Sequence, residues 1–434
     1  MKMNILKVKS CVQFLAIVLL FGGLENFAQG QQLDSLSLEI CHTLAIDNST
    51  ISRQRTLHQQ VAKASIYSVN TGYFPQLELN GQVNYQSDVT QLDITMPGFT
   101  IETPSKDQYR AAIDLNQLIY DGGYISRRKQ LYSTSLQVEK SKLEVEEHQI
   151  KERINGLYLS VLLFNENIRL VELLKNDIST NITNLSAMLQ NGIALKSNVD
   201  ILQAERMKAD QKLIELNSNK KSAINMLSIL LGKELSEKIY FAPPAIEANL
   251  QDNTSNRSEF KLFDMQKVKL QRRSALINTR NMPKIYLFAN GGYGRPGLNM
   301  LSNDFKWYGI AGVKLSIPLT NWLSTQYEKK VVANQQSLID AKRADFARNN
   351  KMQLIQQAIE IDKYQQLIEK DKSIIAKRTG IKETESVKLA NGVSTSNDYI
   401  AELNAENQAK LKLKLHEIQL MQSIINYNSL KGKI

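Results

Sequence analysis

The chain has 434 residues, of which 42% are hydrophobic and 22% charged, and it carries a formal net charge of +11. The excess positive charge is spread among Lys and Glu residues at helical spacing and forms no basic block, which argues against nucleic acid as a partner. Only two cysteines are present, one of them in the leader described below, and the four histidines stand far apart, so the sequence suggests neither a disulfide framework nor a metal site.

Residues 1–28 have the pattern of a secretory signal peptide. Three lysines precede an apolar run from Val12 to Leu20, and Ala28 offers a small residue for cleavage before Gln29. The alternative is an N-terminal membrane anchor, but the apolar run is shorter than the ~20 residues that a helical span needs. Cys11 precedes the apolar run, so it does not fit a lipoprotein cleavage site.

The remaining chain divides into two similar halves, residues 29–240 and 259–434, joined by a polar linker at 241–258. In each half the residue pattern predicts a helix, then a β-hairpin (about 76–119 and 284–318), then a long helical hairpin (about 124–232 and 322–432). Asn-Gly at 191–192 and Gly-Lys at 232–233 recur at 391–392 and 432–433, an offset of 200 in each case. This correspondence indicates an internal duplication.

The first half opens with a pattern that predicts one helix from Leu36 to Thr71, ended by Pro75. The period then changes to two, and four predicted strands have about the 9–11 residues that a tilted strand needs to cross a bilayer. The polar positions on these strands are Glu78, Asn80, Gln82, Asn84, Arg110, Asp114, Asn116 and Lys314. Alternation alone leaves two interpretations open, a membrane sheet and a soluble two-hairpin sheet with one wet face.

The long helices give the strongest periodic signal. Apolar residues recur at steps of three, four and seven from about Tyr124 to Gln190, and a similar segment runs from about Ser324 to Ala390. At 1.5 Å per residue each helix would be roughly 100 Å long, so both must pack along neighbouring helices. Each ends at Asn-Gly, which suits the left-handed residue that closes a helix. Ser197, and Ser394 or Ser396, are the expected N-caps of the returning helices.

One motif resembles a cofactor site. Gly292 to Gly297 fits G-x-G-x-x-G, but a dinucleotide site needs a helix to open there, and the sequence instead predicts a hairpin loop. No Ser/His/Asp or Cys/His grouping is visible, and the many carboxylates lie beside Lys on helical faces, where solvated ion pairs are the default interpretation. We therefore expect neither an enzyme nor a cofactor.

The chain resembles the TolC family of outer-membrane efflux proteins across its length after the leader. Several short motifs carry the resemblance by their order and spacing. They are Leu44-Ala45-Ile46-Asp47-Asn48, Gly72-Tyr73-Phe74-Pro75, Leu118-Ile119-Tyr120-Asp121-Gly122-Gly123, Ser316-Ile317-Pro318-Leu319, and the two tips, Asn191-Gly192 with Ser197-Asn198-Val199-Asp200 and Asn391-Gly392 with Asn397-Asp398-Tyr399.

The resemblance implies an α+β, mainly α fold: a long, coiled-coil-like α-helical barrel plus a trimeric 12-stranded β-barrel with four strands per subunit. It implies a homotrimer in the outer membrane of a Gram-negative bacterium, with the helical part in the periplasm and outer-membrane lipid around the strands. The expected function is an exit duct for small molecules or proteins. Its expected partners are a periplasmic adaptor (membrane fusion protein) and an inner-membrane pump.

The resemblance also suggests a periplasmic gate. Family members carry acidic rings one turn apart after the second tip, and Asp398 matches the outer position. One turn on, the chain has Ala401 with Glu402 beside it, and Asp200 occupies the comparable place in the first half. A first-turn acid is also favoured by the helix dipole alone, and this plainer interpretation stands beside the gate, above all for Asp200.

The Asn191-Gly192 and Asn391-Gly392 tips are the candidate adaptor-docking points, although turn residues need no such role. The polar strand positions would line the lumen. The alternative function is a soluble periplasmic coiled-coil scaffold or adaptor without a channel. It is disfavoured because an adaptor should have one helical hairpin beside a compact β-rich domain, whereas this chain predicts two helical hairpins. The sequence does not identify the exported cargo.

Overall fold

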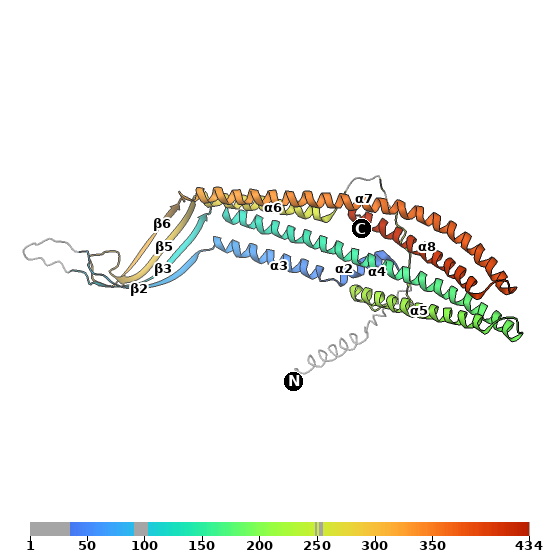
Figure 1. Ribbon diagram of the computed structural model, residues 1–434. Coiled ribbons are helices and arrows are strands. Elements are labelled where there is room, and N and C mark those ends of the chain that lie inside the picture. Colours follow the sequence, from blue (N-terminus) through green and yellow to red (C-terminus); the bar gives the residue numbers. More distant parts are fainter. Residues whose placement is uncertain (1–34, 91–102, 248–249, 251–254, 434) are drawn as a thin grey trace, which may run out of the picture.

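The structure is a computed structural model that describes residues 35–90, 103–247, 250 and 255–433. The predicted signal peptide and Cys11 lie outside the described residues. The molecule is elongated, with a sheet at one end and helices extending from it (Figure 1). The helices are α2 (Leu38–Asn48), α3 (Ile51–Asn70), α4 (Tyr124–Gln190), α5 (Lys196–Leu231), α6 (Ser258–Asn278), α7 (Asn321–Ala390) and α8 (Ser396–Lys431).

The sheet is antiparallel and has the strand order β2-β3-β5-β6. Its strands are β2 (Gln76–Tyr85), β3 (Asp107–Tyr120), β5 (Lys284–Arg295) and β6 (Lys306–Ser316). β3 pairs with β5, so the hairpins of the two halves form one sheet. β2 and β6 each have one neighbour in this sheet, which leaves a row of backbone donors and acceptors along each outer edge. Most of the predicted β2–β3 loop, residues 91–102, lies outside the described residues.

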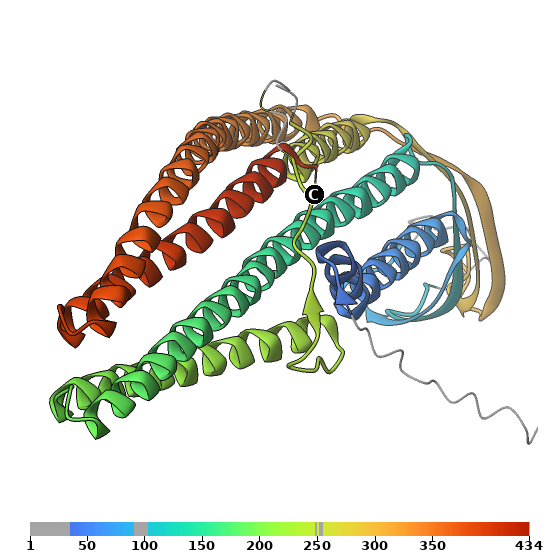
Figure 2. The same cartoon turned by 90° about the vertical axis from the view of Figure 1, so that its right-hand side faces the viewer.

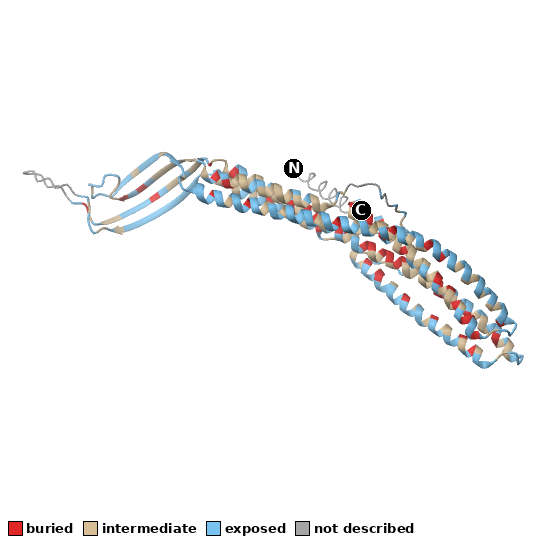
Figure 3. Cartoon of the chain, turned by 45° about the horizontal axis from the view of Figure 1, so that its top comes forward, coloured by how far each residue is buried: buried red, intermediate tan, exposed pale blue. Residues whose placement is uncertain are grey.

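Two helical hairpins, α4 with α5 and α7 with α8, run side by side away from the sheet (Figure 2). α4 is the central helix and contacts α2, α3, α5, α6 and α8. It buries 15 of its 67 residues, whereas α7 buries only 7 of 70. Figure 3 shows the same contrast: buried positions gather where the helices meet, and the sheet is largely exposed. Among the described helices, none combines the length and apolar character needed to cross a membrane.

A small parallel strand pair joins the start of the described chain to the middle. β1 (Ser35–Leu36) pairs with β4 (Tyr240–Phe241). The buried Tyr158 hydroxyl lies 2.7 Å from the Leu36 carbonyl oxygen and 2.6 Å from that of Ala242, and these two acceptors share its single proton. Burial raises the pKa of the Tyr158 hydroxyl, which keeps it protonated as a donor. The expected boundary between residues 240 and 241 therefore falls inside β4, and the expected linker extends one residue too far because α6 begins at Ser258.

The expected single helix from Leu36 to Thr71 is wrong. Two helices replace it, because Ser49 adopts an extended conformation and its hydroxyl bonds the Ile46 carbonyl oxygen at 2.6 Å. Short hydroxyl side chains compete with the helical backbone in this way. The expected N-caps are also wrong. α5 begins after Leu195, which places Ser197 inside the first turn, and α8 is capped by Thr395.

A buried polar joint ties the two halves together between α4, α6 and α8. The Ser429 hydroxyl lies 2.9 Å from both His148 Nε2 and Glu152 Oε1, and Arg257 Nη1 lies 2.6 Å from His148 Nε2. Arg257 also forms an ion pair with Glu259 at 2.5 Å. Hydrogen bonds, first from His148 and then from Ser429, lower the pKa of Glu152 to about 2 although its partial burial opposes this.

Candidate functional site

The eight polar strand positions lie on one face of the sheet. Residues directly opposite in an antiparallel pair share a face, and residues two apart along a strand do so too. The register places Glu78 opposite Asp114, Asp114 opposite Asn290, and Tyr286 opposite Lys314. The same register puts Asn80, Gln82, Asn84, Arg110 and Asn116 on this side. We call this side of the sheet the polar face.

Hydrogen bonds connect the polar face across strands. Asn80 Nδ2 donates to Asp114 Oδ2 at 2.7 Å from β2, and Asn290 Nδ2 donates to Asp114 Oδ1 at 2.5 Å from β5. Arg110 Nη2 donates to Asn290 Oδ1 at 3.2 Å, and its Nε donates to the Tyr308 hydroxyl on β6. Side chains from all four strands thus form one network, which the alternation pattern alone does not specify.

The opposite face is apolar and exposed. Leu79 is 77% exposed and Trp307 is 81% exposed. Other exposed apolar side chains on this face are Leu77, Val83, Ile113, Val313 and Leu315. Contiguous exposed apolar surface of this kind marks an interaction with a membrane or a protein.

Two glycines of the G-x-G-x-x-G motif belong to β5 rather than to the expected hairpin loop. A Cβ at Gly292 would lie 2.5 Å from the Tyr308 hydroxyl oxygen and from the Ala111 carbonyl oxygen. A Cβ at Gly294 would lie 2.7 Å from the Tyr109 carbonyl oxygen. The glycines therefore admit the Tyr308 side chain and the neighbouring strand, and β5 is followed by loop and by β6, not by the helix that a dinucleotide site requires.

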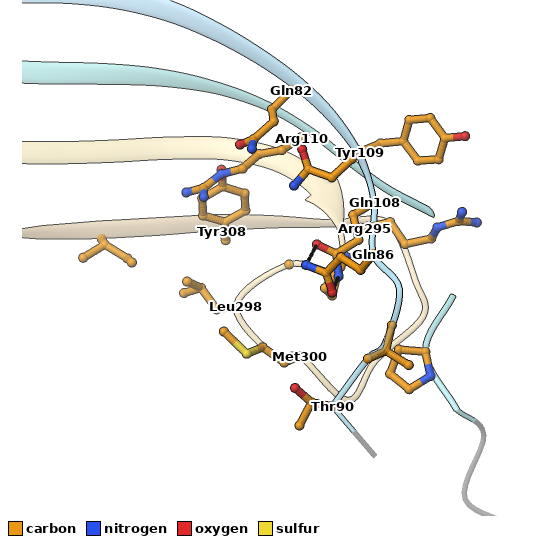
Figure 4. A pocket seen from close by; sticks show the side chains of 16 residues that line it. Gln82, Gln86, Thr90, Gln108, Tyr109, Arg110, Arg295, Leu298, Met300 and Tyr308 are labelled. Atoms are coloured by element: carbon orange, nitrogen blue, oxygen red, sulfur yellow. Dashed lines mark hydrogen bonds between the residues drawn. The ribbon is translucent and has the colours of Figure 1, made fainter. Parts of the chain in front are cut away.

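A cavity of about 350 Å³ lies at the end of the sheet far from the helices. Figure 4 shows Arg110, Tyr308 and Gln82 side by side on one side of the strands, with Leu298 and Met300 of the β5–β6 loop nearby. Gln86 and Gln108 exchange hydrogen bonds of 3.2 and 3.0 Å below them. Tyr109 and Arg295 point away, as their register on the apolar face requires.

The far ends of the two helical hairpins have matching turns. The Gly192 N–H bonds the Leu189 carbonyl oxygen and the Ile193 N–H bonds that of Met188; Gly392 and Val393 make the equivalent bonds to Leu389 and Lys388. Gly192 and Gly392 have φ of 74° and 71°, the left-handed conformation that glycine adopts without strain. Around Asn191 and Asn391 the turns expose three apolar side chains, Ile193, Leu195 and Val393.

Asp398 is exposed and caps α8. Thr395 Oγ1 and the Thr395 N–H donate to Asp398 Oδ2 at 2.6 and 3.1 Å, and the Asp398 N–H donates back to Thr395 Oγ1 at 3.3 Å. These hydrogen bonds, the hydroxyl's first, lower the pKa of the Asp398 carboxyl. Asp398 therefore has a local capping role whether or not it also acts in a gate. Asp200 is exposed on α5 but lies just beyond the first turn, which contains no acidic residue, and α5 lacks a side-chain hydrogen bond from its N-cap residue.

Glu402 is ion-paired with Arg378 of α7, with Nη1 2.8 Å from Oε2. One turn further on, Glu406 is buried and is hydrogen-bonded by Thr379 Oγ1 at 2.7 Å and Lys410 Nζ at 2.9 Å. Burial alone would raise the pKa of Glu406, but the hydrogen bonds from Lys410 and Thr379 and the charge of Lys382 hold it below its usual value. The sequence interpretation missed Glu406, because its spacing resembles that of the solvated carboxylates on the same helices.

The two tips also contact each other. Asn181 Nδ2 of α4 donates to the Tyr399 hydroxyl of α8 at 2.8 Å. An apolar cluster surrounds this bond and contains Ile178, Leu185, Val199, Leu202, Leu389, Tyr399, Ile400 and Leu403. The structure therefore brings Asp398 and Glu402 close to the first hairpin through Tyr399, while the predicted lumen residues lie at the opposite end of the molecule.

Within the described residues, no group of three or more His, Cys, Asp or Glu side chains is placed to hold a metal ion. Cys41, the cysteine outside the leader, is buried, and burial raises the pKa of its thiol to about 12. A buried thiol held protonated is a poor nucleophile and a poor metal ligand.

No protein-family model matches the sequence, and the search of curated proteins finds no match. Solved structures do match. The outer membrane protein VceC from Vibrio cholerae is 12% identical, covering 91% of this chain and 96% of that one, with a TM-score of 0.68. The outer-membrane channel OprN is 11% identical, covering 93% and 91%, with a TM-score of 0.69.

The Campylobacter jejuni CmeC outer membrane channel is 12% identical, covering 91% of this chain and 85% of that one, with a TM-score of 0.67. The chain has the fold of these outer-membrane channels. The resemblance to the TolC family is thereby confirmed at the level of the fold, including the mainly helical composition with a small sheet. None of these neighbours is an enzyme by its description.

Proposed function

We propose that the protein is the outer-membrane exit duct of an export system. The observation that carries the proposal is the sheet, which has one exposed apolar face, one hydrogen-bonded polar face and two open edges, β2 and β6. In lipid every backbone polar group needs a partner, so a sheet with open edges cannot stay alone in a membrane. Three copies, with β6 of each pairing with β2 of the next, give a closed barrel of twelve strands.

In this assembly the polar face lines a water-filled lumen and the apolar face contacts outer-membrane lipid. The aromatic side chains at the far end of the apolar face support this orientation. The Tyr293 ring lies 5.6 Å from that of Phe305 and 5.1 Å from that of Trp307, centroid to centroid. Aromatic residues are enriched where a barrel meets the membrane–water interface. The protein would thus lie in the outer membrane of a Gram-negative bacterium.

The helical hairpins would extend the duct into the periplasm. α4 has 67 residues and α7 has 70, which corresponds to roughly 100 Å each at 1.5 Å per residue. Two hairpins in each of three copies would form a tube with pseudo-sixfold symmetry. The largely exposed α7 fits this tube, because a neighbouring copy would cover much of its surface.

The hairpin tips would receive a periplasmic adaptor, which connects the duct to an inner-membrane pump. The exposed side chains of Ile193, Leu195 and Val393 around the Asn191-Gly192 and Asn391-Gly392 turns support this proposal, since exposed apolar patches mark protein contacts. The same end would hold the gate. Asp398, Glu402 and Asp200 are the candidate gate residues, and the buried Glu406 holds α8 against α7 behind them.

The duct is tested by fractionation and conductance. The full-length protein should stay in the membrane pellet after carbonate extraction and should form ion-conducting channels in a planar bilayer. Release by carbonate together with no conductance would instead support a soluble periplasmic scaffold. Val393→Asp tests adaptor docking separately: it should weaken capture of the adaptor and leave conductance unchanged, and Leu298→Asp at the opposite end is the control.

A further inference from the structure

The polar face has an uneven charge distribution that bears on the cargo. Its acidic residues, Glu78 and Asp114, lie in the middle of the sheet, opposite each other in the register. Its basic residues lie toward the two ends. Arg110 and Lys306 are at the far end, and Lys284 and Lys314 are at the end where the strands meet the helices.

The basic end next to the helices contains a cavity of about 450 Å³, which we call the junction cavity. Lys284 and Tyr286 of β5 and Gln76 of β2 line it from the polar face, and Tyr124 and Arg128 line it from α4. Lys314 is directly opposite Tyr286 in the register, so it flanks the cavity from β6. The cavity thus receives positive charge from three elements that belong to both halves of the chain.

As far as the structure describes the chain, the cations of the junction cavity are not paired with carboxylates. Arg128 donates to the hydroxyls of Tyr124 and Tyr132, and its guanidinium lies 5.4 Å from the centre of the Tyr124 ring. Within the described part of the chain, no ion pair involves Arg128, Lys284 or Lys314. A guanidinium has five N–H donors, so Arg128 keeps donors for a ligand after bonding both tyrosines.

The one acidic residue that lines the cavity, Asp121, is occupied elsewhere. It is buried, and its two carboxylate oxygens accept the Gly123 N–H at 2.7 Å and the Ile125 N–H at 2.6 Å at the start of α4. Its charge is therefore directed at the helix N-terminus, where the helix dipole favours an anion. The surface left for a solute is basic and aromatic.

Resting on the proposed duct, we infer that the junction cavity is a binding site for an oxyanion group, carboxylate or phosphate, and that the duct exports anionic cargo. Arg128 supplies a fork of donors and Lys284 a mobile ammonium, the two groups that recognise such oxygens. The tyrosine rings provide flat surfaces for an organic body attached to the anion. A threefold assembly has three such sites where the helical tube opens into the barrel.

Blockade of single channels by inorganic pyrophosphate tests the inference. The full-length protein is inserted in a planar bilayer, and pyrophosphate is added on the helical side. We expect concentration-dependent interruptions of the current. Because each variant removes a charge-assisted hydrogen bond to the anion, Lys284→Gln and Arg128→Gln should each weaken the blockade roughly tenfold or more. Lys212→Gln, on α5 far from the sheet, should leave it unchanged.

The variants separate the possible outcomes. Lys284 has no ion pair to lose among the residues that the structure describes, so Lys284→Gln keeps the test valid even if Arg128→Gln misfolds. Conducting channels that pyrophosphate blocks equally in the wild type, Lys284→Gln and Arg128→Gln would overturn the anion site and leave the duct intact. Absence of any channel would overturn the duct itself. Reversal potentials in a KCl gradient give a second measure: anion preference should fall in Lys284→Gln and rise in Glu78→Gln.

Discussion

Lys382 of α7 and Glu406 of α8 form an ion pair, with Nζ 3.3 Å from Oε2, at a point where the Glu406 side chain is 3% exposed. Lys382 Nζ also lies 3.9 Å from Asp177 Oδ2 of α4. The pair therefore joins both helices of the second hairpin to the first hairpin, close to the tips. Any movement of α8 relative to α7 at this end must disturb a buried charge.

Lys382→Met should loosen this end of the second hairpin. The substitution leaves the Glu406 carboxylate with Lys410 and Thr379 only, and losing one charged partner costs about 1–3 kcal/mol. Hydrogen exchange should show faster local opening of α7 and α8 around residues 379–410. The double variant Lys382→Met/Glu406→Leu should recover most of the protection, since no buried charge is left unpaired. Unaltered exchange in Lys382→Met would contradict the structural role of the pair.

The possible role of the Asp398 charge in a gate and its role in capping α8 with Thr395 can be tested separately. Asp398→Asn removes the charge and keeps a capping side chain, whereas Thr395→Ala removes the cap partner and keeps the charge. If the carboxylate acts in the gate, Asp398→Asn should raise single-channel conductance and lower cation preference, and Thr395→Ala should change neither. Equal effects of both variants would indicate that the cap is what matters. Unchanged conductance in Asp398→Asn and Asp398→Ala would remove Asp398 from the gate.

The candidate gate residues show how much of the site could be predicted from the sequence. The family resemblance suggested Asp398, but its reciprocal hydrogen bonds with Thr395 depend on the N-cap of α8, which is Thr395 rather than the expected Ser394 or Ser396. Glu406 could not be identified at all. With Lys410 at i,i+4 it resembles a solvated ion pair, and its contacts with Thr379 and Lys382 come from the preceding helix α7, which spacing within α8 does not reveal.

The joint between the halves should weaken in acid. The pKa of Glu152 is about 2 in the folded protein against an ordinary value of 4.5, so the folded state favours the ionised form. This stabilisation is fully present above pH 4.5 and is lost as the pH falls from 4.5 toward 2. The amide protection factors of the last turns of α8, corrected for the intrinsic exchange rate at each pH, should therefore fall across that window. Glu152→Gln should flatten the dependence, whereas Glu215→Gln, in an exposed pair with Lys212, should preserve it.

Two glycines with the same backbone conformation should tolerate alanine differently. Gly192 and Gly232 have φ of 74° and 65°, and an alanine in this left-handed region costs about 1–2 kcal/mol. At Gly192 the space for a Cβ is open, but at Gly232 it would lie 2.2 Å from Asn48 Oδ1. Gly232→Ala should therefore lower the unfolding temperature more than Gly192→Ala. Equal losses would show that Asn48 moves aside without cost.

The long helices and the strand faces were accessible from the sequence because their signals are local. Heptad spacing of apolar residues predicts α4 from Tyr124 to Gln190. The alternation of polar and apolar residues predicts the two strand faces, because successive side chains point to opposite faces. The β1–β4 pair was not accessible. Ser35–Leu36 pairs with Tyr240–Phe241, about two hundred residues away in sequence. Strands of two residues are too short to produce an alternating pattern.

The open edges of β2 and β6 have a consequence for how the protein is made. A single copy that has formed its sheet exposes an apolar face and two edges with unpaired backbone donors and acceptors. It is therefore prone to aggregation in water and cannot insert stably in lipid. In the proposed duct, ring closure and membrane entry must therefore be coupled. A copy with one defective edge would still join a neighbour and then stop the ring from closing. When such a variant is produced together with the wild type, it should block assembly of the wild-type copies and have a dominant negative effect.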